Sequence, residues 1–225
     1  SQTAWMLDGS GVRITSGERL AEIVRAGAAA GWPVGVHAIG DRANREALDA
    51  FEQTRDVWQP LGLRQRIEHA QCLAAEDVAR FAAIGVAVSA QFTHAPSDEG
   101  LATRFWPDKL AQAYSFRSLL DSGALVANGS DAPVEELDPW AGVVAAVERH
   151  WREDQRFTLE QALHATCVAP TWLSHDERVR GTLVPGRYAD LVVLDRDPFG
   201  SELGDVQVVA TMVAGRWVHN PPPWD

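Results

Sequence analysis

Short apolar runs alternate with longer segments of helical spacing over the first three quarters of the chain. The spacing of Leu20, Ile23 and Val24 after Ser16 predicts a capped helix over residues 17–30. The pattern continues with a strand that ends at His37, a helix over 42–58, a strand over 63–69, a helix over 74–84, a strand over 85–90, a long loop over 91–109, a helix over 111–122, a strand over 124–129, and helices over 139–151 and 159–167. Alternating strands and helices predict a parallel sheet with right-handed crossovers.

The last quarter of the chain has a different pattern. A turn-rich segment leads into an apolar run at 191–194, and residues 207–214 and 216–219 form a predicted hairpin around Gly215. We therefore expect two parts, an α/β region over 1–177 and a small all-β module over 178–225.

Three of the predicted strands end in side chains that can carry chemistry, namely His37, His69 and Asp131. His69 lies 32 residues after His37 and Asp131 lies 62 residues after His69, which is close to one and two βα units of an eightfold barrel at about 31 residues each. Side chains at these strand ends would share one rim. Only four strands are predicted, so a closed barrel would need another chain segment or a second copy to cover its edges.

Two imidazoles and a carboxylate that converge on one point suit Zn²⁺ or another divalent metal. Each residue also has a simpler interpretation, because a single strand-end His is commonly a satisfied polar residue, and Asp131 alone could cap the turn 130–133. His94 follows the strand over 85–90 on the same rim and is a candidate substrate-binding residue, although a loop His is more often plain surface.

Composition narrows the class of protein. The net charge of −11 argues against nucleic-acid and membrane-surface binding, which need basic patches. No apolar run approaches the ~20 residues of a membrane span, and no signal peptide is recognised. Cys72 and Cys167 form neither a disulfide framework nor a metal knuckle, so we expect a cytoplasmic protein. The start at Ser1 without Met indicates a fragment or a processed product.

Several motifs together resemble the amidohydrolase superfamily, and most of all its amidohydrolase family 3 (YtcJ-like) branch. They are His-Ala-Ile-Gly-Asp-Arg-Ala at 37–43, Ile-Glu-His-Ala-Gln at 67–71, Asn-Gly-Ser-Asp-Ala-Pro-Val at 128–134, the segment 181–195, which is similar to the closing β-sandwich signature, and Ser-Gln-Thr-Ala at 1–4. The resemblance implies the C-terminal half of a TIM-type (β/α)8 barrel followed by a β-sandwich portion. It also implies that His37 and His69 are metal ligands, and that Asp131 touches the metal and acts as general base and then as acid.

The resemblance further implies hydrolysis of an amide-type C–N bond of a small molecule by metal-activated water. The family's His-x-His and its bridging Lys or acidic residue would precede Ser1, and no His-x-His occurs in this chain. A binuclear site therefore requires the missing N-terminal ligands, from an N-terminal half or another partner such as a second copy. Two alternatives stay open: a deaminase of the same superfamily, and a catalytically silent fragment that binds a partner as a half-barrel.

Overall fold

The computed structural model describes residues 11–221, so the segment 1–4 lies outside the described residues. Its first part is a four-stranded parallel sheet in the order β1-β2-β3-β4, formed by β1 (Gly35–Ala38), β2 (Arg66–His69), β3 (Ala87–Ala90) and β4 (Val126–Asn128). Neighbouring strands are in register at their carboxyl ends, where Ala38 lies opposite His69 and Ala90 lies opposite Asn128. The residues that follow these strands therefore meet along one edge, as the alternating sequence pattern predicted.

Helices fill the connections between the strands. They are α1 (Gly17–Ala29), α2 (Asp41–Gln53), α3 (Arg55–Trp58), α4 (Ala75–Ile84), α5 (His94–Ser97), α6 (Glu99–Phe105), α7 (Phe116–Asp121), α8 (Pro139–Glu148), α9 (Leu159–Leu163) and α10 (Ala169–Leu173), with the short helical turns η2 (Pro107–Gln112), η3 (Glu153–Gln155), η4 (His164–Val168) and η5 (Leu203–Asp205). Ser16 caps α1 as expected, because its side-chain oxygen accepts from the backbone N–H of Arg19.

The core lies between the parallel sheet and these helices. Ile67 and Val88 point from the central strands into it, and both are fully buried. Phe92, just after β3, packs against Phe116 and Phe157, with ring centroids 5.6 Å and 5.1 Å away. This packing fixes the segment that leads from β3 into α5.

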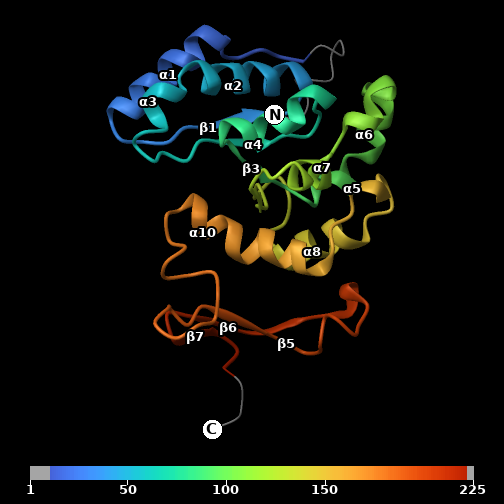
Figure 1. The fold of residues 1–225 in the computed structure, drawn as a ribbon. Helices are drawn as coiled ribbons and strands as arrows, with labels where there is room; N and C mark the ends of the chain where they lie inside the picture. The colour runs from blue at the N-terminus through green and yellow to red at the C-terminus, as the bar shows by residue number, and fades with distance from the viewer. Residues whose placement is uncertain (1–10, 222–225) are drawn as a thin grey trace.

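A second, antiparallel sheet follows in the order β5-β6-β7, formed by β5 (Leu191–Leu194), β6 (Val208–Val213) and β7 (Arg216–His219). The predicted hairpin around Gly215 is confirmed. Helices α8 and α10 lie between the two sheets (Figure 1). The Trp140 indole N–H donates to the carbonyl of Leu203 at 3.0 Å, and the Leu203 N–H donates to the Glu148 carboxylate at 3.1 Å.

Several predictions about helix ends were wrong. The helix expected over 42–58 is interrupted at Thr54, whose hydroxyl donates back to the carbonyl of Ala50 at 2.7 Å. The helix expected over 111–122 begins only at Phe116, and residues 111 and 112 belong to the separate turn η2. The helix expected over 159–167 continues to Leu173, because a π-helical stretch realigns the backbone and Pro170 falls in the first turn of α10. Proline is tolerated there, where its missing N–H has no intrahelical partner to lose.

The prediction of a long loop over 91–109 was also wrong. This segment is largely helical, with α5, α6 and the start of η2 in it. Polar residues and two prolines hid the helical spacing, and the buried face of the segment includes His94 and Asp98. None of the described helices has the length and apolar character needed to cross a membrane.

Candidate metal centre

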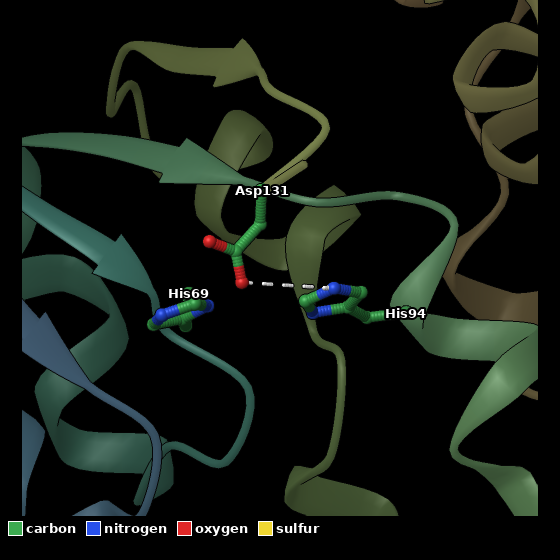
Figure 2. Close-up of side chains that lie close together, drawn as sticks. All are labelled: His69, His94 and Asp131. Atoms are coloured by element: carbon green, nitrogen blue, oxygen red, sulfur yellow. Dashed lines mark ion pairs between the residues drawn. The ribbon is translucent and has the colours of Figure 1, made fainter. Parts of the chain in front are cut away.

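Three side chains from separate connections meet at the carboxyl edge of the parallel sheet. His69 is the last residue of β2, His94 is the first residue of α5 after β3, and Asp131 lies three residues beyond β4. One potential ligand atom from each lies within 4.8 Å of the other two. Figure 2 shows the Asp131 carboxylate pointing into the space between the two imidazole rings. The two rings are nearly parallel, with an interplanar angle of 13° and centroids 6.0 Å apart.

The backbone at this edge is held in an unfavourable conformation. His69, Ala70 and Asp131 have positive φ angles of 76°, 48° and 56°. Such left-handed geometry costs of order 1–3 kcal/mol for a residue with a Cβ atom, and it concentrates at functional sites. The Ala70 N–H donates to the Ala38 carbonyl at 3.1 Å, which helps to hold the turn after β2. The surrounding fold thus maintains a strained backbone at two of the three residues in the group.

His37 joins the group through His69. Its Nδ1 lies 2.8 Å from His69 Nε2, and the ring centroids are 4.9 Å apart. His37 is exposed, whereas His69 is buried. Two nitrogens on a tetrahedral Zn²⁺ with Zn–N bonds of 2.0–2.1 Å would lie about 3.3 Å apart, so a small adjustment would let both imidazoles bind one ion.

The electrostatic environment keeps His69 neutral. Burial is the largest cause that lowers the pKa of His69, and the adjacent His37 adds to it. The Asp131 carboxylate and the Gln91 side chain act in the opposite direction, Gln91 through hydrogen bonding. A neutral imidazole retains the lone pair that a metal ligand requires.

His94 belongs to a buried polar chain that the sequence analysis did not identify. Its Nε2 lies 4.0 Å from Asp131 Oδ2, and its Nδ1 lies 3.2 Å from the Gln71 side-chain nitrogen. That nitrogen also donates to Asp98 at 3.2 Å, and Asp98 accepts from the Tyr114 hydroxyl at 2.6 Å. Two spacings could have indicated the chain: Gln71 follows His69 by two residues, and Asp98 follows His94 by four, one helical turn.

Comparison with known proteins identifies the family of this chain. The sequence model of the amidohydrolase family matches residues 1–219. The chain belongs to the amidohydrolase family. YtcJ of Bacillus subtilis (strain 168) is a relative in this family, 30% identical over 93% of this chain and 42% of its own length. N-substituted formamide deformylase of Arthrobacter pascens is 28% identical over 82% of this chain and 36% of its own length.

A solved structure supports the fold of this chain. An uncharacterised metal-dependent hydrolase from Pyrococcus horikoshii OT3 superimposes with a TM-score of 0.78 at 31% identity, over 88% of this chain and 41% of the other. The chain therefore spans about two fifths of the length of the relatives it matches.

The residues at the edge of the sheet fit a metal of the kind an amidohydrolase uses. Imidazole nitrogens and a carboxylate oxygen are ligands that Zn²⁺ accepts. Neither His69 Nδ1 nor His94 Nε2 has a hydrogen-bond partner among the described residues, and both atoms are buried. A buried polar atom without a partner is uncommon, so this edge of the sheet holds polar groups that the described residues do not satisfy. Of the residues that the sequence singled out, His69 and Asp131 lie in one group with His94, and His37 contacts His69.

A cavity of about 730 Å³ lies elsewhere on the amidohydrolase chain, between α8, the start of α5 and the segment 204–208. Its lining includes Thr93, Trp140 and Glu148 but none of His69, His94 and Asp131. The candidate metal centre and this cavity are therefore separate features.

Proposed function

We propose that this chain carries part of the active site of a metal-dependent amidohydrolase that cleaves an amide-type C–N bond in a small molecule. One observation carries the proposal, the convergence of His69, His94 and Asp131 at the carboxyl edge of a parallel sheet. Membership of the amidohydrolase family supports the reaction class. The name of the Arthrobacter pascens relative supports an N-substituted amide as the kind of substrate.

His37 Nδ1, His69 Nε2 and the Asp131 carboxylate are the proposed ligands of Zn²⁺ or another divalent ion. A bound Zn²⁺ supplies Lewis acidity and lowers the pKa of a water from about 15.7 to about 7. His69 Nδ1 is buried without a hydrogen-bond partner among the described residues, and His69 Nε2 lies 2.8 Å from His37 Nδ1. A neutral ring that carries its proton on Nδ1 keeps the lone pair of Nε2 for a metal.

Asp131 is the proposed proton carrier. Its half-buried carboxylate lies at the centre of the group, where Oδ2 can accept a proton from the attacking water and return it to the leaving nitrogen. His94 was expected to bind substrate. Its place beside Asp131 is compatible with contact to a bound amide, and its substrate-binding role stays a prediction.

We further propose that the parallel sheet is half of a (β/α)8 barrel and that the β5-β6-β7 sheet is part of a β-sandwich, with a boundary near residues 177 and 178. The helices packed on the parallel sheet end at Leu173 and the antiparallel sheet begins at Leu191, which supports this boundary. The coverage of about two fifths of its relatives' length supports a half-barrel. An N-terminal half, or a second copy, would supply the other barrel strands and any ligands of a second metal. The cytoplasmic location also stays a prediction.

Replacing Asp131 by Asn tests the proposal. After chelation, the purified protein is reloaded with Zn²⁺, Co²⁺ or Mn²⁺ and assayed on N-formyl and N-acetyl amines, with release of the amine as the signal. We expect metal-dependent hydrolysis that falls about 10²–10⁴-fold in Asp131→Asn, because the proton carrier is lost. Asp138→Asn is the matched control, since Asp138 only caps α8 and Asn also caps helices. Equal hydrolysis by all three proteins would contradict the proposal.

A further inference from the structure

A chain of buried polar side chains leads from the interior of the protein to His94. The Tyr114 hydroxyl donates to Asp98 at 2.6 Å, and the Gln71 side-chain nitrogen donates to the same carboxylate oxygen at 3.2 Å. The same Gln71 nitrogen lies 3.2 Å from His94 Nδ1. All four side chains are at most 5% exposed, so their polar atoms must form hydrogen bonds with one another.

The direction of each hydrogen bond follows from chemistry. Tyr114 is a donor, because burial and the neighbouring Asp98 carboxylate raise the pKa of its hydroxyl. Asp98 accepts from two donors, which suits an ionised carboxylate. The Gln71 amide must present its NH₂ group to Asp98, because a reversed amide would set two acceptor oxygens against each other. The second hydrogen of that NH₂ group is then available for His94 Nδ1.

An imidazole that accepts at Nδ1 carries its proton at Nε2 in the neutral state. We propose that Asp98 and Gln71 lock His94 as the Nε2–H tautomer, so that His94 faces Asp131 as a hydrogen-bond donor and not as a metal ligand. This inference rests on the proposed function, because it distinguishes His94, which would position Asp131, from the residues that would hold the ion. A metal ligand would need a lone pair at Nε2, and the buried chain places a hydrogen there.

The proton at Nε2 would face the Asp131 carboxylate. His94 Nε2 lies 4.0 Å from Asp131 Oδ2, and a small approach would complete an N–H···O bond that orients the carboxylate.

Nitrogen NMR of the histidine side chains tests the tautomer directly. The protein contains seven His residues, and uniform ¹⁵N-His labelling with long-range ¹H–¹⁵N correlation distinguishes a protonated ring nitrogen from an unprotonated one. We expect His94 to show protonated Nε2 and unprotonated Nδ1 near neutral pH, with His94→Asn identifying the signals by their loss. Protonation at Nδ1 in the unmodified protein would overturn the inference, whether or not the protein hydrolyses any amide.

A charge-conserving exchange sharpens this test. The double variant Gln71→Glu/Asp98→Asn keeps the size and net charge of the pair but turns the group that faces His94 into an acceptor. We expect His94 to switch to the Nδ1–H tautomer in this variant. Tyr114→Phe is the matched control, because it removes a donor to Asp98 and leaves the Gln71 amide in place, so the tautomer should not change. An unchanged tautomer in the exchange variant would contradict control by Gln71.

Metal stoichiometry separates this inference from the proposed function. With Zn²⁺ titrated into each protein and bound metal measured by mass spectrometry, His94→Asn should retain the metal content of the unmodified protein and His69→Asn should lose it. Equal loss in both variants would make His94 a ligand and overturn the inference. If no protein bound Zn²⁺, the proposed function would fail, while the NMR result would still decide the tautomer of His94.

Discussion

The two sheets of this molecule differ in how deeply their side chains are buried. The hydrophobic core cluster runs from Leu20 to Ala165 and surrounds the parallel sheet. Beyond residue 177, the buried hydrophobic residues within the described part of the chain are Leu203, Val206 and Ala210. Strands β5 and β7 instead expose apolar side chains such as Val192 and Val218. The candidate metal centre lies at the carboxyl edge of the well-packed sheet.

This difference explains where chemistry can be placed. A ligand group needs its atoms held within a fraction of an ångström, and strands fixed by a dense core provide that precision. The positive φ angles of His69 and Asp131 also require surroundings that maintain them. The β5-β6-β7 sheet holds none of the candidate ligands and presents apolar side chains such as Val192 and Val218 on its surface.

The largest expected effect is on the free energy of unfolding, when one side chain from each region is shortened to Ala. Phe92→Ala should lower the free energy of unfolding by about 3–5 kcal/mol, because it leaves a cavity between Phe116 and Phe157. Val218→Ala, at a residue 60% exposed on β7, should change it by less than about 0.5 kcal/mol. Urea unfolding monitored by circular dichroism measures both. Similar losses in the two variants would show that the packing difference between the sheets does not determine stability.

Metal binding should stabilise the parallel-sheet region selectively. Zn²⁺ at 100 times its dissociation constant should add about 2.7 kcal/mol to the free energy of unfolding, because the ion binds the folded state. His69→Ala should abolish this gain, and a chelator should remove it from the unmodified protein. His150→Ala, at an exposed residue outside the group, is the control and should keep the gain. The shift in thermal midpoint with added Zn²⁺ measures the effect, and a gain that survives His69→Ala would argue against the ligand assignment.

The contact between the two regions should contribute less. Trp140→Phe removes the indole N–H that donates to the Leu203 carbonyl at 3.0 Å and keeps most of the ring. We expect a loss of about 0.5–1.5 kcal/mol, the net value of one hydrogen bond. Hydrogen exchange should report faster opening in residues 203–219 than in β2. Uniformly faster exchange in both regions would indicate that the two sheets unfold as one unit.

The sequence predicted the features that depend on local pattern. Alternating strands and helices, the strand ends at His69 and near His37, and the hairpin around Gly215 all appear in the structure. Each follows from hydrophobic period or from turn residues within a short window. The group formed by His69, His94 and Asp131 brings together residues up to 62 positions apart, and the regular spacing of βα units was the signal that made part of it predictable.

The parts that the sequence did not reveal depend on tertiary contacts. The segment over 91–109 looked like a loop, and its helices become clear only when His94 and Asp98 are seen to face the interior. The buried chain joins Gln71 and Tyr114 to the turn that carries His94 and Asp98, and these three segments are brought together only by the tertiary fold. Tyr114 has a positive φ of 52°, a conformation that its sequence neighbours do not predict.

The smallest expected effect concerns an ion pair between the loop before β2 and the segment after α10. The Arg64 guanidinium donates to both carboxylate oxygens of Glu177, at 2.6 Å and 2.9 Å, and this hydrogen bonding lowers the pKa of Glu177 from 4.5 to about 2. A carboxyl group whose pKa is depressed by folding contributes stability above its unfolded pKa, and this contribution is lost as the pH falls through the folded value. Glu177→Gln should therefore reduce the urea midpoint near pH 6 by a small amount, and the difference from the unmodified protein should disappear between about pH 4.5 and pH 2. A difference that stays constant over this range would show that the pair acts through packing of Arg64 on Trp172, whose ring centroid lies 4.4 Å from the guanidinium, and not through charge.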